Sequence, residues 1–223
     1  MKAINRIFFI GILFSTLSIT ANAQLDDILR RMESHAKALS SLKSNITMTK
    51  HDTTLDVYDT QNGSVNYLPG NGKNVYLRVD WVTPAPETLI VANGEYVLYR
   101  PKLKQAIVGK TSDAEKKQRE NNALAFMTMS RAELKRNYQI QYLGVEKIDG
   151  VDMWRLRLNP KVAAGFKYAE LWADGNGMPI QSMIVEKNND TTTILLSDIQ
   201  KNVTLQGSIF KPKLPKGTKI IKG

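Results

Sequence analysis

The sequence contains no cysteine, only two histidines and none of the common catalytic motifs. Without cysteine the chain has no disulfide, thiolate metal ligand, cysteine nucleophile or lipid-modified N-terminal cysteine. His35 and His51 are too few for a multi-histidine metal site, so we expect no metal and no cofactor. No HExxH, G-x-S-x-G or GxGxxG motif occurs. The sequence therefore favours a binding protein over an enzyme.

Long apolar runs are also scarce, and the one at the N-terminus is typical of an export signal. Lys2 and Arg6 precede an uncharged apolar stretch over 7–19, and small residues follow at Ala21 and Ala23. The stretch is shorter than the ~20 residues that cross a bilayer comfortably. We expect residues 1–23 to be a cleaved signal peptide, with an uncleaved anchor as the alternative. Residues 24–223 then form one exported domain.

Acidic residues are outnumbered, because 31 lysines and arginines face 21 aspartates and glutamates, which gives a net charge of +10. The basic residues are scattered, so each small cluster is best interpreted as a solvated face. Export makes nucleic acid a poor candidate partner, and the charge instead favours an anionic membrane surface or an acidic partner.

Apolar periodicity predicts an α+β chain that is mainly antiparallel β. Spacings of one, three and four predict an amphipathic helix over 25–42. After residue 44 the period becomes two, and over 73–83 only one face is apolar, as in a half-buried antiparallel strand. Four Asn-Gly or Asp-Gly pairs separate such runs and predict tight hairpins in a sequential meander: 62–63, 93–94, 149–150 and 174–175.

A second helix is predicted over 112–136, where Ser112 and Glu115 match a capping box, with a loop over the highly polar residues 113–122 as the alternative. Its second half is apolar on more than one side, unlike a surface helix. The composition of residues 208–223 predicts an edge strand or an extended end. One helix over a one-sided sheet leaves room for an apolar cavity, although a simple packed core explains the same residues.

Three segments, together with their order along the chain, resemble the periplasmic outer-membrane lipoprotein carrier family, the LolA-like proteins. The segment LRVDWVTPAPETLIVANGEYVLYRP (77–101) resembles the family's aromatic strand, hairpin and following proline. ALAFMTMSRAELKRNYQI (123–140) resembles its lid region, and FKPKLPKGTKII (210–221) resembles its C-terminal ending.

The resemblance implies an incomplete antiparallel barrel whose concave apolar face is covered by helices. It implies a monomeric periplasmic chaperone, without catalysis, that takes acylated lipoproteins from an inner-membrane ABC-type transporter to an outer-membrane receptor or membrane surface. The expected acyl-chain cavity consists of Leu77, Val79, Trp81, Leu89, Val91, Tyr96 and Leu98, and the expected lid of Phe126, Met127 and Met129.

The family also has an arginine before the aromatic strand that helps to hold the lid closed. In GNGKNVYLRVDW (70–81) the candidates for this gating role are Lys73 and Arg78. Two other functions stay open. One is a related module that senses or receives lipids or lipoproteins in regulation, and the other is an exported enzyme on a β-scaffold.

Overall fold

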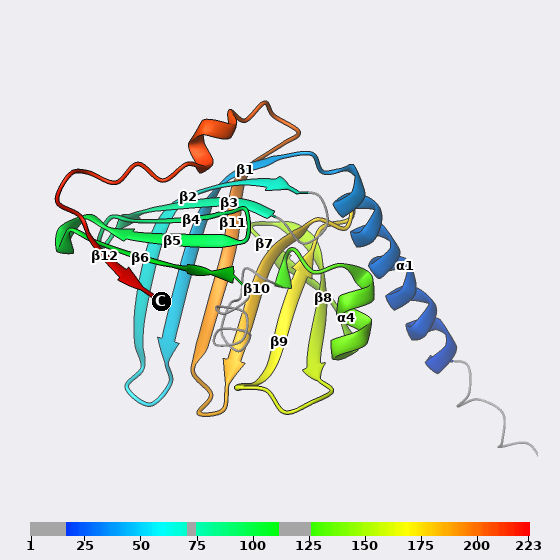
Figure 1. The fold of residues 1–223 in the computed structure, drawn as a ribbon. Helices are drawn as coiled ribbons and strands as arrows, with labels where there is room; N and C mark the ends of the chain where they lie inside the picture. The colour runs from blue at the N-terminus through cyan, green and yellow to red at the C-terminus, as the bar shows by residue number, and fades with distance from the viewer. Residues whose placement is uncertain (1–16, 71–74, 112–125) are drawn as a thin grey trace, which may run out of the picture.

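The computed structural model describes residues 17–70, 75–111 and 126–223. Within them, twelve strands form one sheet that curves into an open half-barrel without closing (Figure 1). The described residues also form the helices α1 (Leu17–Ala38) and α4 (Arg131–Asn137). The α+β half-open antiparallel barrel predicted for this sequence is confirmed.

The sheet consists of two antiparallel meanders joined side by side. The order is β12-β6-β5-β4-β3-β2-β1-β11-β10-β9-β8-β7, so β1 and β11 form the junction. The strands are β1 (Leu42–Asp52), β2 (Val57–Pro69), β3 (Val75–Thr83), β4 (Glu87–Ala92), β5 (Glu95–Arg100), β6 (Gln105–Lys110), β7 (Tyr138–Ile148), β8 (Val151–Pro160), β9 (Phe166–Ala173), β10 (Pro179–Glu186), β11 (Thr191–Lys201) and β12 (Lys219–Lys222). β12 pairs in parallel with β6, which confirms an edge strand in the C-terminal tail.

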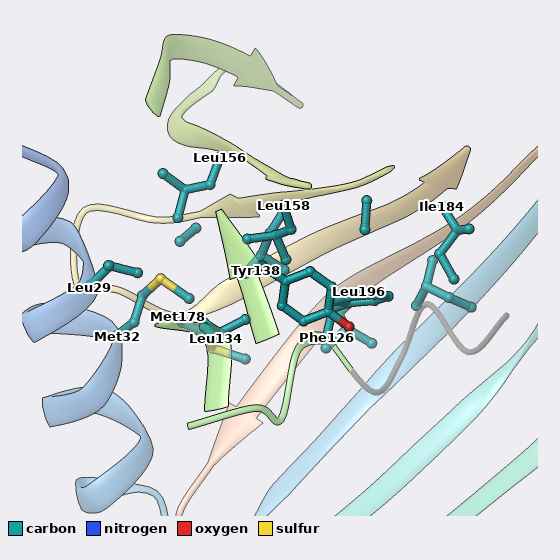
Figure 2. Packing of buried hydrophobic residues seen from close by; sticks show 14 of the residues in the cluster. Leu29, Met32, Phe126, Leu134, Tyr138, Leu156, Leu158, Met178, Ile184 and Leu196 are labelled. Atoms are coloured by element: carbon teal, nitrogen blue, oxygen red, sulfur yellow. The ribbon is translucent and has the colours of Figure 1, made fainter. Parts of the chain in front are cut away.

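The inner face of the sheet carries the main core, in which alternate residues of the strands meet α1 and α4. From α1 the apolar stripe contributes Ile28, Leu29 and Met32. Figure 2 shows Leu29 and Met32 facing Leu156 and Met178 from the second meander. None of the described helices combines the length and hydropathy needed to cross a membrane.

The outer face also buries side chains, which the one-sided pattern did not predict. Ile90 and Ala106 point outward, and Phe210 from the 3-10 turn η2 (Gly207–Phe210) is only 3% exposed. Phe210 packs against Tyr76 with ring centroids 5.8 Å apart. The C-terminal segment therefore covers the outer side of β3 and β4, as its contacts with both strands confirm.

A buried carboxylate lies on the outer face of the second meander. Glu170 on β9 has no exposed side-chain surface, and its two oxygens bind Arg155 at 2.6 Å and Arg157 at 2.7 Å. Arg155 and Arg157 also lie over the rings of Trp172 and Tyr168. These contacts compensate the charge of Glu170, because removing it from water without a partner would be costly.

Three of the four predicted Gly-containing turns are present, and one prediction is wrong. Residues 93–94, 149–150 and 174–175 lie in turns between strands. Asn62 and Gly63 instead lie inside β2, where the register with β3 shifts. A Cβ on Gly63 would stand 2.2 Å from the carbonyl oxygen of Asp80, so this glycine permits a close backbone approach at a bulge.

Gly177, in the turn between β9 and β10, has a tight contact with the first helix. Its φ is +85°, and a Cβ there would lie 2.4 Å from the carbonyl carbon of Arg31 and from the amide nitrogen of Met32. The hairpin therefore supports the backbone of α1 directly. Two residues earlier, a Cβ on Gly175 would meet nothing within 4 Å.

The helix boundaries differ from the predicted ones. α1 ends at Ala38, and Leu42 already belongs to β1. α4 is short, and its capping box uses Ser130 and Glu133. The predicted box at Ser112 and Glu115 lies outside the described residues, as do residues 1–16 of the expected signal peptide.

Candidate functional site

The seven residues expected to line the acyl-chain cavity lie on the inner face of three adjacent strands. Strand register places Leu77 opposite Val91 and Val79 opposite Leu89. The next pairing places Leu89 opposite Leu98 and Val91 opposite Tyr96. Trp81 shares this face, two residues beyond Val79. The seven side chains therefore form one continuous apolar surface of β3, β4 and β5.

The side chains of this apolar surface become less buried from the packed core toward β6. Val79 is 2% exposed and belongs to the core, and Leu77, Trp81 and Leu89 pack against that core while only half-buried. Val91, Tyr96 and Leu98 are also half-buried, on the β4 and β5 side. Such partly covered apolar side chains on a concave face suit an apolar ligand.

The three residues expected in the lid lie just before α4. Phe126 is 2% exposed and makes edge-on contacts with Tyr138 and Phe166, at centroid distances of 5.6 and 5.8 Å. Figure 2 shows Phe126 beside Tyr138. Met127 and Met129 are half-buried against the same core. The ring contacts of Phe126 are thus with β7 and β9 rather than with β3, which carries Trp81.

Exposed ion pairs join the two helices beside this segment. Asp26 on α1 accepts hydrogen bonds from Lys135 at 2.7 Å and Arg131 at 3.0 Å on α4. These bonds lower the pKa of Asp26 below its usual 3.8. Arg131 also lies 3.7 Å from Glu33. The contact between α1 and α4 combines this charged rim with apolar packing of Leu29 and Leu134.

Of the two gating candidates, Arg78 is described by the structure and lies on the outer face. Lys73 lies outside the described residues. Arg78 points to the outer face, where it donates to Asp80 at 2.6 and 2.8 Å and to the carbonyl oxygen of Ile209 at 2.9 Å. Its partners are therefore on the side opposite Phe126.

The sequence argument missed a charged pair on the inner face itself. Arg100 ends β5 two residues after Leu98, and Glu87 begins β4 two residues before Leu89. Arg100 Nε lies 3.1 Å from Glu87 Oε1, and both side chains are about one-third exposed. Period two along β4 and β5 could have indicated this placement, but the nearby lysines suggest a solvated basic cluster instead.

Two cavities flank the half-barrel without occupying its concave face. A small one of about 190 Å³ lies between α1 and the start of α4, lined by Met32, Ala36, Met129 and Leu134 among others. The larger one, about 760 Å³, lies on the outer face under the C-terminal segment. In the described part of the chain, no group of three or more His, Cys, Asp or Glu side chains is placed to hold a metal ion.

The described residues thus form an open half-barrel with an apolar inner face, an architecture that suits binding of an apolar ligand. The sequence model of the outer membrane lipoprotein carrier protein LolA matches residues 37–213. The chain therefore belongs to the LolA family. The comparison with curated proteins gave no match.

Solved structures with this fold are remote in sequence. An uncharacterized conserved protein from Thermus thermophilus is 12% identical with a TM-score of 0.59, and the match covers 90% of this chain and 99% of that one. MucB is 12% identical with a TM-score of 0.56, covering 86% of this chain and 63% of that one. The MucA/MucB complex of Pseudomonas aeruginosa gives 11% and 0.50, with coverage of 85% and 61%. At these identities the likeness shows the shared fold.

Proposed function

We propose that the protein is a periplasmic carrier that binds lipoprotein acyl chains on its apolar inner face. In this role it receives lipoproteins from an inner-membrane ABC-type transporter and passes them to an outer-membrane receptor or membrane surface. The observation that carries the proposal is the continuous half-buried surface of β3, β4 and β5 in a member of the lipoprotein carrier family. Residues 1–23 act as the cleaved export signal.

The energetics of acyl burial suit a carrier that must also release its ligand. An acyl chain of ~15 methylene groups gains about 12 kcal/mol if it is fully removed from water. Two or three such chains would exceed the ~18–21 kcal/mol at which non-covalent affinity saturates. Covering helices that pack on the inner face when it is empty lower the net affinity, because the ligand must displace them. Phe126 packs on the inner face at β7 and β9, in the same core cluster as Val79 of the proposed acyl surface.

The test uses spheroplasts that synthesise a labelled lipoprotein. Purified protein is added, and the soluble fraction is analysed for a complex between the protein and the lipoprotein. Leu89→Gln places a polar group on the inner face, and Val82→Gln is its matched control because Val82 on β3 is 66% exposed. We expect release by the natural protein and by Val82→Gln, and about tenfold weaker acyl binding by Leu89→Gln.

A second candidate is a regulatory module that senses lipids or lipoproteins. It is favoured by the fold shared with MucB, a protein solved in complex with MucA. If the natural protein is folded by circular dichroism but releases no lipoprotein, the carrier function is refuted. Partner capture and lipid extraction then test the sensing role. Equal release by Leu89→Gln would instead place the acyl site elsewhere.

A further inference from the structure

The larger cavity on the outer face is a polar site that the acyl-binding function does not use. Its floor is one cross-strand row, because register pairs Gln200 with Lys43, Lys43 with Asn66, and Asn66 with Arg78. Its roof is the chain segment 203–209, which Figure 1 shows in orange above the sheet. The cavity thus lies between four strands and the C-terminal segment.

Both ends of the roof are fixed, so the cavity is a built feature of the fold. At one end, the Ser41 hydroxyl donates to the carbonyl oxygen of Val203 at 2.5 Å. At the other end, Arg78 donates to the carbonyl oxygen of Ile209, and the neighbouring Phe210 is buried. The volume of about 760 Å³ between these anchors falls within the ~300–1,000 Å³ of small-molecule sites.

The charges around this cavity are of one sign. Lys43, Arg78 and Lys213 line it, and none of the described lining residues is an aspartate or glutamate. The charge of Arg78 is compensated by Asp80. The lysines supply the remaining charge, and the amides and hydroxyls beside them come from Asn66, Gln200, Gln206, Thr204 and Ser208.

This combination of groups matches an anion rich in oxygen atoms. Lysine ammonium groups act as point charges for phosphate, and neutral amide and hydroxyl donors can bind its remaining oxygens. Lys43 and Lys213, with no carboxylate among the described lining residues, create a positive potential that a bound anion relieves. The cavity is larger than phosphate alone, so the phosphate belongs to a larger polar molecule.

We propose that this outer-face cavity binds a phosphate group, carried either by a lipid headgroup or by a free phosphorylated molecule. The site is on the face opposite Trp81 and Leu89, so it is independent of the acyl-chain proposal. Lys43 and Lys213 bind the charge, and Gln200 and Ser208 contribute hydrogen bonds. The C-terminal segment 203–209 forms the roof of this site.

The first test titrates inorganic phosphate into the full protein and follows backbone amide resonances by NMR. We expect saturable shifts at Gln200, Thr204 and Ser208. The double variant Lys43→Gln/Lys213→Gln should weaken binding about tenfold or more. The matched control Lys102→Gln/Lys187→Gln removes the same charge at exposed lysines outside the cavity and should keep the natural affinity.

The second test separates the two sources of phosphate with vesicles of phosphatidylglycerol or phosphatidylcholine. Lysine-dependent binding to phosphatidylglycerol alone identifies a lipid headgroup. If the protein binds inorganic phosphate but the two double variants bind vesicles equally well, the ligand is a free phosphorylated molecule. The proposal is overturned if phosphate shifts no cavity amide, or if both double variants lose affinity equally while circular dichroism shows them folded.

Discussion

Replacing Gly177 by alanine tests whether the β9–β10 turn positions the first helix. The alanine Cβ would lie 2.4 Å from the backbone of Arg31 and Met32, far inside any real contact. Backbone atoms of a helix cannot rotate away as a flexible side chain can. The turn or α1 must therefore move, and α1 carries Ile28 and Leu29 into the core.

Two costs add at this position. The φ of +85° is strained for any residue with a Cβ, by about 1–2 kcal/mol. Overpacking against a fixed backbone typically costs about 1–3 kcal/mol. We expect Gly177→Ala to lower the free energy of unfolding by about 2–5 kcal/mol, a large part of the ~5–15 kcal/mol that stabilises a typical domain.

The assay is urea denaturation followed by circular dichroism, with hydrogen exchange to locate the effect. The matched control is Gly175→Ala in the same turn, where the new Cβ meets nothing within 4 Å. We expect the control to change stability by less than about 1 kcal/mol. Faster exchange in α1 should accompany only Gly177→Ala. Equal unfolding midpoints for the two variants would refute the argument.

Burial and repulsion by Lys201 lower the pKa of His35 below 6.5, so the unfolded state takes up this proton at a higher pH than the folded state does. The free energy of unfolding should therefore be constant above about pH 7 and decrease below it, by at most about 1.4 kcal/mol per pH unit. Urea titrations between about pH 7 and 5.5 should show that His35→Gln has lost this slope. Phe210→Ala should lower the free energy of unfolding by about 3 kcal/mol and speed hydrogen exchange over 203–212 without weakening acyl binding. Unchanged exchange over these residues would contradict this prediction. Glu170→Gln should lower the free energy of unfolding by about 3 kcal/mol, because Arg157 loses its counter-charge and Arg155 keeps only Glu146; exposed Glu95→Gln should be neutral by denaturation.

The inner-face surface was predictable because alternation reveals which residues of a strand share a face. Leu77, Val79 and Trp81 alternate with Tyr76, Arg78 and Asp80, and the pairing of Leu89 with Leu98 follows from the Asn-Gly turn between β4 and β5. Turn type fixes register in a hairpin. Whether this surface binds acyl chains stays a prediction.

Features that depend on distant segments were not predictable from local pattern. The cover over Ile90 comes from residues near Phe210, which have no periodicity that marks them as a cover. Asn62 and Gly63 fit a hairpin and a bulge equally well, and only the partner strand decides between them. Period two along β5 would place Arg100 with Leu98 on the inner face, but the neighbouring Lys102 and Lys104, which follow the end of the strand, suggest a solvated cluster instead.

The junction of the two meanders joins a strand made early in synthesis, β1, to one made late, β11. Ser44 on β1 bonds to the carbonyl oxygen of Ser197 on β11, which lies 153 positions later. A growing or truncated chain that stops before β11 can form the first meander but leaves one edge of β1 unpaired. Open strand edges are templates for aggregation. The edge of β1 is therefore covered only after Thr191–Lys201 have been synthesised and have paired with it.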